Sequence, residues 1–470
     1  HDGRLEETLL LRLRGKAPSP AAEAAEAAED DEAAEGAEEE GAEVPSALCG
    51  LDDLALAAEL CCARNFRDFV LLSALAERLA PAVAAAPLDT LRGIGTAYAS
   101  LGVLNPPLFQ ALAASYLAAL PSAAEPLPAA HVAQIARAFS AQRLRHEELF
   151  DALAAQLRAG GGAAAAAPEQ ALSLLHSHAF LRLGDGLAGL WDELEAQALA
   201  GSATPGGQIG PLAELAYLLV LTRRADSRLD DVRGLLGQLA RPVLDASAAH
   251  WASGEGPAAR KRLLVIRGAL RYLHRDAYRA LPAEVLQALR KVHRLESPLA
   301  TLKPTVSFTR KASKLLTKMK IGHIVNAEAA PFLFDIVERD KKLVYELNHF
   351  DRFYAGTTEK IATMCLQERV VKAMGYRVVQ VPHWQWNKMH HKKQRAEYLR
   401  MSRYYALKDS RELSPRDDVP TDVAMNEFDY LGEYFFRKEM PSSAWSWFQP
   451  RYDYTKRIPA AAAAPAAPAG

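Results

Sequence analysis

The chain has 470 residues, 50% of them hydrophobic, and a formal net charge of −1. This length suits two to four domains of ordinary size. It contains no run of about 18 apolar residues, so we predict neither a membrane-spanning helix nor a membrane partner. Its four cysteines show no Cys-x-x-Cys or Cys/His ligand spacing. We therefore predict no metal, no cofactor and no disulfide framework.

The near-zero net charge hides an asymmetry along the chain. Residues 1–50 carry 14 Asp/Glu against 4 Lys/Arg, and residues 51–300 carry 24 of each. Residues 301–470 carry 28 Lys/Arg against 19 Asp/Glu. A basic carboxyl-terminal third favours a polyanionic partner, because each neutralised phosphate releases counterions. A merely solvated basic surface explains the same charge equally well.

Residues 1–48 are rich in Ala and Glu, and we predict an acidic, disordered linker there. Residues 49–298 contain an apolar repeat with a period of 41 residues. The repeated pairs are Ala97-Tyr98, Ala138-Phe139 and Ala179-Phe180, then Leu108-Phe109, Leu149-Phe150 and Leu190-Trp191. Each unit shows two segments of helical period around a turn. Such hairpins must stack to bury their apolar faces, which predicts an α-solenoid with the repeated aromatic residues in its core.

Residues 299–330 are predicted to be a basic connector, and the composition changes after them. Apolar side chains then alternate over residues 332–336 and 343–347, with a polar stretch between, which predicts a β-hairpin. If the turn is centred between Asp340 and Lys341, paired residues have numbers that sum to 681. Asp335 then lies opposite Glu346, on the face away from the apolar side chains. Facing carboxylates destabilise a strand pair unless a cation, a proton or a basic side chain lies between them.

The remaining elements of residues 331–408 follow in order. An amphipathic helix is predicted over residues 356–374, with Thr357 or Thr358 as its cap, and a strand over residues 377–381. The next segment is predicted to be a rigid loop because it begins at Pro382. A basic helix over residues 392–407 completes the order β-β-α-β-α, which implies a small α/β sandwich.

These segments resemble the RAP domain, a carboxyl-terminal module of organellar RNA-binding proteins. The resemblance covers residues 331–405 and rests on the strings Pro-Phe-Leu-Phe-Asp, Tyr-Glu-Leu-Asn, Gly-Tyr-Arg-Val-Val, Pro-His-Trp-Gln-Trp and Lys-Lys-Gln-Arg-Ala-Glu-Tyr-Leu-Arg. It implies a restriction-endonuclease-like α/β fold and RNA-related work in mitochondria, or alternatively in plastids. Helical repeats followed by a RAP domain are also the usual arrangement in that family.

Nucleases of that fold hold Mg²⁺ between two carboxylates and use a lysine two residues after the second one. Asp335 and Glu346 fit the two carboxylate positions, but Asn348 stands at the lysine position. Gln380 can face the same pocket. These four residues are vestigial candidates, and we expect no catalysis from them.

Other side chains near these four residues leave alternatives open. Lys360 or Lys372 can reach the carboxylates from the predicted helix and replace the missing lysine. The carboxylates can instead be relics that bond locally or pair with an arginine such as Arg377.

Aromatic and basic side chains around the Trp-Gln-Trp segment are the predicted RNA contacts. Aromatic rings stack on unpaired bases, which contributes about 1–3 kcal/mol per base, and cations hold phosphates. The stacking candidates are His383, Trp384, Trp386 and Tyr398, and the phosphate candidates are Arg377, Lys388, Lys392, Lys393, Arg395 and Arg400. We expect at least one of the two indoles to pack against the sheet instead.

Residues 409–458 are aromatic and basic without a clean period, and residues 459–470 form an Ala/Pro tail. The aromatic extension either covers its own α/β domain or docks on an RNA or protein assembly.

The leading hypothesis is a mitochondrial RNA-binding protein that binds rRNA or mRNA. We expect it to be a stable part of a ribonucleoprotein, such as the mitochondrial ribosome, alongside ribosomal proteins. The alternatives are a transient RNA-processing or stability factor, a metal-dependent endoribonuclease, and a scaffold whose solenoid binds only protein.

Overall fold

The computed structural model describes residues 50–122, 125–183, 189–200, 209–252, 254–295, 307–329 and 331–408. They form two compact units. The first contains the described residues up to 178 together with residues 183–197, and the second contains residues 179–182 and the described residues from 198 onward. No helix in the described ranges is long and apolar enough to cross a membrane. The predicted linker (1–48), aromatic extension (409–458) and tail (459–470) lie outside the described residues.

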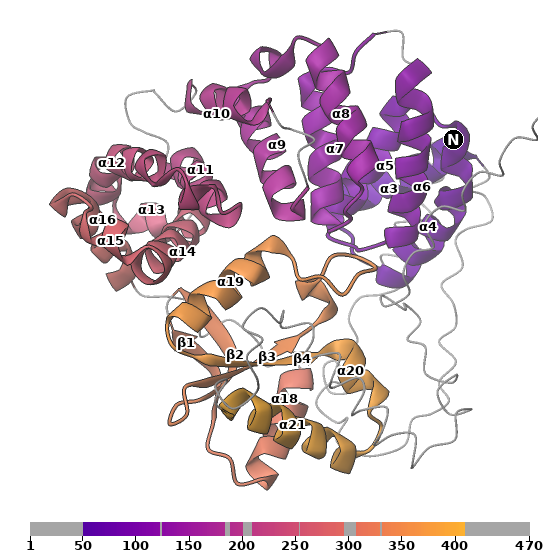
Figure 1. Cartoon of the computed structure of the whole chain (residues 1–470). Helices are drawn as coiled ribbons and strands as arrows, with labels where there is room; N and C mark the ends of the chain where they lie inside the picture. Colours follow the sequence, from indigo (N-terminus) through magenta and orange to yellow (C-terminus); the bar gives the residue numbers. More distant parts are fainter. Residues whose placement is uncertain are drawn as a thin grey trace, which may run out of the picture. The chain divides into compact units, whose positions relative to one another are not determined.

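The amino-terminal part is an array of helical hairpins (Figure 1). Its helices are α3 (Leu51–Ala63), α4 (Phe69–Ala82), α5 (Leu88–Leu101), α6 (Pro106–Ala119), α7 (Ala129–Ala141), α8 (Glu147–Ala159), α9 (Pro168–Leu181) and α10 (Trp191–Ala200). Corresponding helices α5 and α7 begin 41 residues apart, as do α6 and α8. This spacing confirms the predicted helical repeat.

The repeated aromatic residues lie in the core between these helices, as predicted. Tyr98 and Phe109 are fully buried, and Phe139 and Phe150 are each 1% exposed. The rings of Phe109 and Phe139 meet edge to face with centroids 5.2 Å apart. Phe180, at the end of α9, is only half-buried.

The turn inside each hairpin also repeats. Gly102 and Arg143, 41 residues apart, follow the first helices with φ angles of 68° and 55°. Three residues later, Asn105 and His146 each accept a hydrogen bond from the backbone N–H three residues further on, at 3.0 and 3.3 Å. These caps satisfy backbone donors that a helix start leaves without a partner.

The second unit continues with further helices. They are α11 (Ile209–Leu221), α12 (Leu229–Asp245), the short α13 (Ala248–Ala252), α14 (Gly256–Leu273), the short α15 (Arg275–Arg279) and α16 (Ala283–Arg294). Their packing is that of helical hairpins, since α11 contacts α12 and α14, and α16 contacts α12 and α14.

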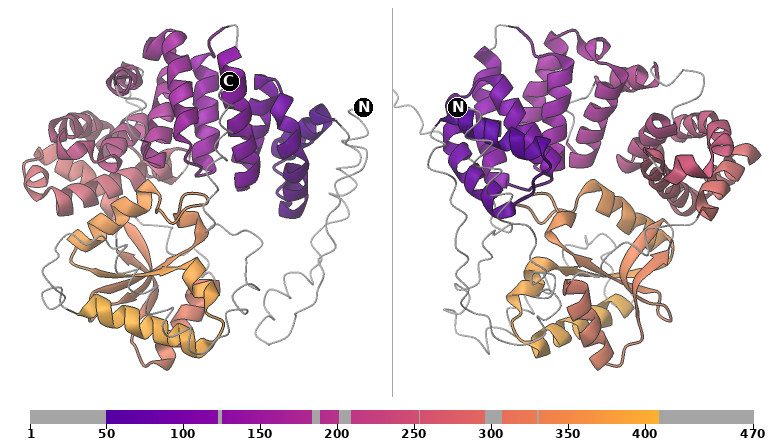
Figure 2. Two further views of the ribbon diagram at one scale, coloured as in Figure 1. Left: turned by 45° about the vertical axis from the view of Figure 1, so that its right-hand side comes forward. Right: turned by 180° about the vertical axis from the view of Figure 1, so that it is seen from behind.

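The α/β domain of this unit is a four-stranded sheet between helices. Its elements are α18 (Ser307–Lys318), β1 (Ile324–Ala329), β2 (Phe332–Glu338), β3 (Leu343–Asn348), α19 (Ala362–Ala373), β4 (Arg377–Pro382), α20 (His383–Lys388) and α21 (Lys392–Leu407). The strand order is β1-β2-β3-β4, with antiparallel pairs except for the parallel pair β3/β4. Helix α19 lies on one face of the sheet, and α18 and α21 lie on the other (Figures 1 and 2).

The register of the predicted hairpin is confirmed. Ile336 pairs with Tyr345 and Val337 with Val344, so the paired numbers sum to 681. The same register places Asp335 opposite Glu346. The apolar alternation on the two strands was sufficient to predict this pairing, because a slip of one residue would turn the apolar set away from the core.

The domain begins earlier than predicted, because α18 and β1 lie within the residues assigned to a connector. Phe308, Leu315 and Leu316 of α18 are buried in the domain core. Their spacing of seven and eight residues places them on one face of a helix. Arg310 and three exposed lysines on the other faces of α18 give the segment a basic composition, which obscured this apolar face.

Two predictions after β3 were wrong. Helix α19 begins at Ala362, with Ile361 at its N-cap, and not at a threonine cap near residue 357. Tyr354 N–H donates to the carbonyl oxygen of Glu359 at 3.0 Å, which closes the preceding residues into a loop. The segment after Pro382 is the short helix α20 and not a rigid loop.

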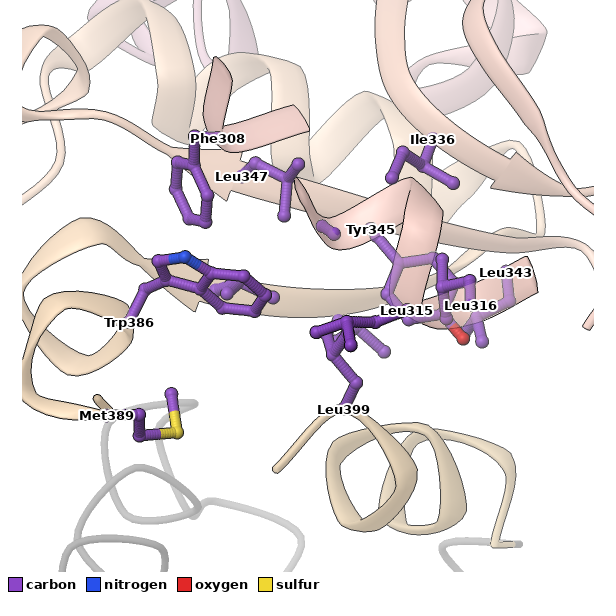
Figure 3. Close-up of a cluster of buried hydrophobic side chains, with 13 residues drawn as sticks. Phe308, Leu315, Leu316, Ile336, Leu343, Tyr345, Leu347, Trp386, Met389 and Leu399 are labelled. Atoms are coloured by element: carbon purple, nitrogen blue, oxygen red, sulfur yellow. The ribbon is translucent and has the colours of Figure 1, made fainter. Parts of the chain in front are cut away.

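The core between the sheet and α18, α20 and α21 holds a cluster of buried apolar side chains (Figure 3). Tyr345 and Leu347 reach it from β3, and Trp386 reaches it from α20. Figure 3 shows the Trp386 indole lying between Phe308 and Met389, directed toward the sheet. This packing fixes α20 against the carboxyl end of β4.

Candidate functional site at the ends of strands β3 and β4

Parallel pairing of β3 and β4 brings polar side chains together at the carboxyl ends of both strands. Glu346 pairs with Gln380, and Asn348 pairs with Pro382. In α/β sheets, ligands commonly bind outside the carboxyl ends of parallel strands. The four vestigial candidates, Asp335, Glu346, Asn348 and Gln380, all lie here, on the side of the sheet that faces α19.

A polar network joins these four side chains to Arg352 and Lys360. The guanidinium of Arg352 donates to both carboxylate oxygens of Asp335, each at 2.7 Å, and to Asn348 Oδ1 at 3.4 Å. Asn348 Nδ2 donates to Gln380 Oε1, and Gln380 Nε2 donates to Glu346 Oε2 at 3.0 Å. Two carboxylates thus face each other across a strand pair with cationic and amide groups between them.

Lys360 completes the network at its other end. Its ammonium lies 3.4 Å from Glu346 Oε2 and 2.6 Å from Glu368 Oε2. Lys372 contacts the other oxygen of Glu368 at 2.7 Å. Of the two lysines considered from sequence, Lys360 therefore reaches the carboxylate and Lys372 does not.

Because the network is buried, the pKa of each charged group in it depends on its charged neighbours. Asp335 is 5% exposed, Glu346 1% and Asn348 not at all. Burial alone lowers the pKa of Arg352, but Asp335, with smaller effects of Glu346 and Asp351, raises that pKa above its usual value. Burial alone raises the pKa of Glu368, but Lys360 and Lys372 hold it below its usual value. The network is therefore a set of neutralised charges inside the domain.

The arginine that neutralises Asp335 is Arg352 and not Arg377, which was the sequence-based suggestion. Arg377 begins β4, at the opposite end of the strand, and donates to the carbonyl oxygen of Leu407. Among the described residues, no three His, Cys, Asp or Glu side chains converge to hold a metal ion. Asp335 offers its oxygens to a guanidinium, which occupies the side where a cation would bind.

Aromatic side chains gather beside the network at the same strand ends. We call them the aromatic rim: His349, Phe350 and Phe353 after β3, and His383 and Trp384 from α20. The Trp384 indole meets the Phe353 ring at 4.5 Å and the His383 ring at 5.1 Å. Phe350 is 40% exposed and lies 6.3 Å from His383. Rings from two segments therefore form one partly exposed surface.

The histidines of the rim are held in the neutral form. Burial lowers the pKa of His383, and the neighbouring His349 lowers it further. Burial also lowers the pKa of His349. At neutral pH both imidazoles therefore present uncharged rings.

The two tryptophans have different roles. Trp386 is 3% exposed and belongs to the core, so its assignment as an RNA contact was wrong. Trp384 is half-buried and belongs to the rim. Residues two apart on a helix point about 200° apart, so the helical conformation of α20 sends the two indoles to opposite sides. The loop predicted from sequence does not imply this division.

The basic candidates are spread over α20 and α21. Lys388, Lys392 and Lys393 are exposed near the junction of these two helices. Arg395 is half-buried, with its guanidinium 5.1 Å from the centre of the Trp386 ring. Arg400 is exposed and pairs with Glu397 at 2.7 Å.

Tyr398 connects α21 to the neighbouring elements. Its hydroxyl group donates to Gln385 Oε1 at 2.6 Å and lies 3.3 Å from the carbonyl oxygen of Gln380. This side chain therefore has a structural role, although it was predicted as a stacking residue.

Arg352, Phe350 and Phe353 were not among the predicted site residues. All three lie in the run His-Phe-Asp-Arg-Phe-Tyr that follows β3. Three aromatic residues and an arginine directly after a buried strand are a sequence pattern that could have indicated a binding site. The predicted helix start near residue 356 gave no reason to place these side chains in the site.

Residues 345–401 match the family model of the RAP domain. The match runs from β3 to α21 and includes most of the polar network and the whole aromatic rim. The chain therefore carries a RAP domain toward its carboxyl end, after a helical array. This domain is generally RNA-binding and not catalytic. A search of curated proteins found no match to the chain.

Proposed function

Because the chain carries a RAP domain, we propose that it is a mitochondrial RNA-binding protein whose aromatic rim holds unpaired bases. The observation that carries this proposal is the partly exposed group of Phe350, His383 and Trp384 at the ends of β3 and β4. Exposed lysines lie on the adjoining helices α20 and α21. An aromatic surface next to cations suits single-stranded RNA, since bases stack on the rings while lysines contact the phosphates.

RNA affinity tests the role of the rim. Trp384→Ala in the full chain should weaken binding of single-stranded RNA about tenfold, because one base stack contributes about 1–3 kcal/mol. Trp384→Phe, which retains an aromatic ring, should lose less RNA affinity than Trp384→Ala. Tyr404→Ala is the matched control, because Tyr404 is 55% exposed in the last turn of α21, away from the rim. Wild-type affinity in Trp384→Ala would contradict the proposal.

We further propose that the protein is a stable part of a ribonucleoprotein, such as the mitochondrial ribosome, and contacts rRNA and ribosomal proteins. The support is the RAP domain together with the basic carboxyl-terminal third of the chain. Mitochondrial fractionation and sedimentation, with sequencing of the bound RNA, test this. Co-migration with ribosomal particles is expected. Migration only with free protein or mRNA would favour a transient processing or stability factor.

A metal-dependent endoribonuclease is the second candidate, and two observations favour it. Lys360 brings an ammonium to Glu346, although Asn348 stands at the expected lysine position. Glu346 Oε1 is also buried without a hydrogen-bond partner among the described residues. We expect no Mn²⁺-dependent cleavage of single-stranded RNA by the full chain. Cleavage that Glu346→Gln abolishes while RNA binding persists would establish the enzyme instead.

A further inference from the structure

Helix α14 of the second unit carries an unbalanced positive charge. Its 18 residues include five Lys/Arg and no Asp or Glu. Three of the arginines, Arg260, Arg267 and Arg271, are spaced by seven and four residues, which places them on one face of the helix. This face turns toward α16, because Arg260 donates to the carbonyl oxygen of Leu295, directly after that helix.

The charges of the three arginines act on His293 of α16, and we call these four residues the α14 stripe. Burial lowers the pKa of His293, and Arg267, Arg271 and Arg260 lower it further, against an opposing effect of Glu328 on β1. His293 and Arg271 are exposed, and Arg267 is half-buried. Arg267 and Arg271 are therefore the charged groups of the stripe that solvent reaches, whereas Arg260 is 9% exposed.

Arg267 and Arg271 form no ion pair with a carboxylate in the described ranges, in contrast to their neighbour on another face of α14. Arg262 pairs with Glu214 of α11 at 3.2 Å. The guanidinium group of Arg267 is half-buried and that of Arg271 is exposed, so both can donate to a ligand from solvent. A phosphate group is an acceptor that suits the fork of guanidinium donors.

The stripe lies beside the RAP domain within the same unit. A Cβ on Gly268, next to Arg267, would lie 3.1 Å from the ring of Pro331, directly before β2. Glu328, whose charge acts on His293, belongs to the edge strand β1. The stripe is thus distinct from the aromatic rim, which lies at the ends of β3 and β4.

We propose that the α14 stripe binds the phosphate backbone of the RNA held by the RAP domain, with Arg267 and Arg271 as the direct contacts. This inference rests on the proposed RNA-binding function and adds a second surface to it. The contacts read no bases, because phosphates carry no sequence information. The RNA affinity that the stripe adds therefore depends strongly on salt concentration and does not depend on RNA sequence.

The test is RNA affinity of the full chain as a function of salt. The variant is Arg267→Gln with Arg271→Gln, measured with single-stranded RNAs of two unrelated sequences. Affinity should fall equally for both RNAs, and the slope of log affinity against log salt should become less steep by about 0.7 for each lost phosphate contact. Arg275→Gln with Arg279→Gln on α15 removes the same charge from exposed positions outside the stripe. This control should keep the wild-type slope.

The outcomes separate the stripe from the proposed function. A wild-type slope in the stripe variant, with weakened binding in Trp384→Ala, would overturn the stripe alone. The absence of any RNA binding by the wild-type chain would overturn both proposals. If the stripe variant keeps its RNA affinity but loses binding of polyglutamate, the surface takes an acidic protein, and the RNA assignment is wrong.

Discussion

Arg352 compensates the charge of a carboxylate, Asp335, that is buried inside the RAP domain. It forms an ion pair with Asp335, which is 5% exposed. Removal of one partner of a buried ion pair leaves an uncompensated charge, which costs about 3–5 kcal/mol. Replacement of both partners by uncharged groups avoids most of that cost.

Arg352→Met should therefore lower the free energy of unfolding by about 3–5 kcal/mol. Asp335→Asn combined with Arg352→Met should be less destabilised than Arg352→Met alone. Urea unfolding of the full chain, followed by circular dichroism, measures both. Equal stability of the single and double variants would show that the buried carboxylate is not what Arg352 compensates.

His178 should make the helical array sensitive to acid. It is 5% exposed, its ring meets that of Phe150 at 5.1 Å, and burial lowers its pKa to about 3. In the unfolded chain the pKa returns to about 6.5. Below about pH 6.5 the His178 imidazole binds a proton in the unfolded state but stays neutral in the folded state. Stability is therefore lost as pH falls from about 6.5 to about 3, and the effect is absent above pH 7.

His178→Phe removes this proton uptake while it keeps a ring in the core. From pH 7 to pH 5, wild-type stability should fall by about 2 kcal/mol more than that of His178→Phe. The measurement is urea unfolding of both proteins at the two pH values. An equal loss in both proteins would show that His178 is not buried as a neutral ring.

The residue roles were only partly predictable from sequence. The facing carboxylates Asp335 and Glu346 followed from apolar alternation, because strand register is a local property. The arginine that neutralises Asp335 did not follow, since Arg352 reaches it from a loop whose path depends on tertiary packing. Trp384 and Trp386 look equivalent in sequence, and only the helical conformation of α20 separates rim from core.

At the scale of elements, the turns of the hairpin array depend on backbone that favours glycine. Gly102 has a φ of 68°, and a Cβ added to it meets no atom within 4 Å. A substitution there therefore tests backbone strain without a steric clash. An L-residue with a side chain loses about 1–2 kcal/mol in this left-handed conformation.

Gly102→Ala should destabilise the hairpin of α5 and α6 by about 1 kcal/mol. Gly102→Asn should cost less, because asparagine tolerates left-handed backbone. Amide hydrogen exchange in the two helices of the full chain measures this local opening. Faster exchange in the asparagine variant than in the alanine variant would contradict the role assigned to this turn.

Periodicity predicted the long elements well and the short ones poorly. The 41-residue repeat, the hairpin of β2 and β3, and α21 at Lys392–Leu407 were all recognised, since each has a long or strictly alternating apolar pattern. Helix α18 and strand β1 were missed. In α18 three exposed lysines and an arginine give the segment a basic composition that obscures its five buried residues. In β1 the apolar positions after Val325 are alanines, which are depleted in strands.

For the whole molecule, structural support and the proposed RNA binding lie in different parts of one domain. Buried carboxylates at the sheet ends are neutralised by Arg352 and Lys360 and hold the loop after β3 in place. This loop carries Phe350 and Phe353 to meet His383 and Trp384. The polar network thus positions the surface that we propose for RNA.

The central claim is that RNA bases contact the aromatic rim. Ultraviolet cross-linking of the full chain to single-stranded RNA, followed by mass spectrometry of the cross-linked peptides, tests this most directly. Cross-links should map to Phe350, His383 and Trp384, and Trp386 should give none because it is buried. Cross-links confined to other parts of the chain, with the rim unmodified, would contradict the account.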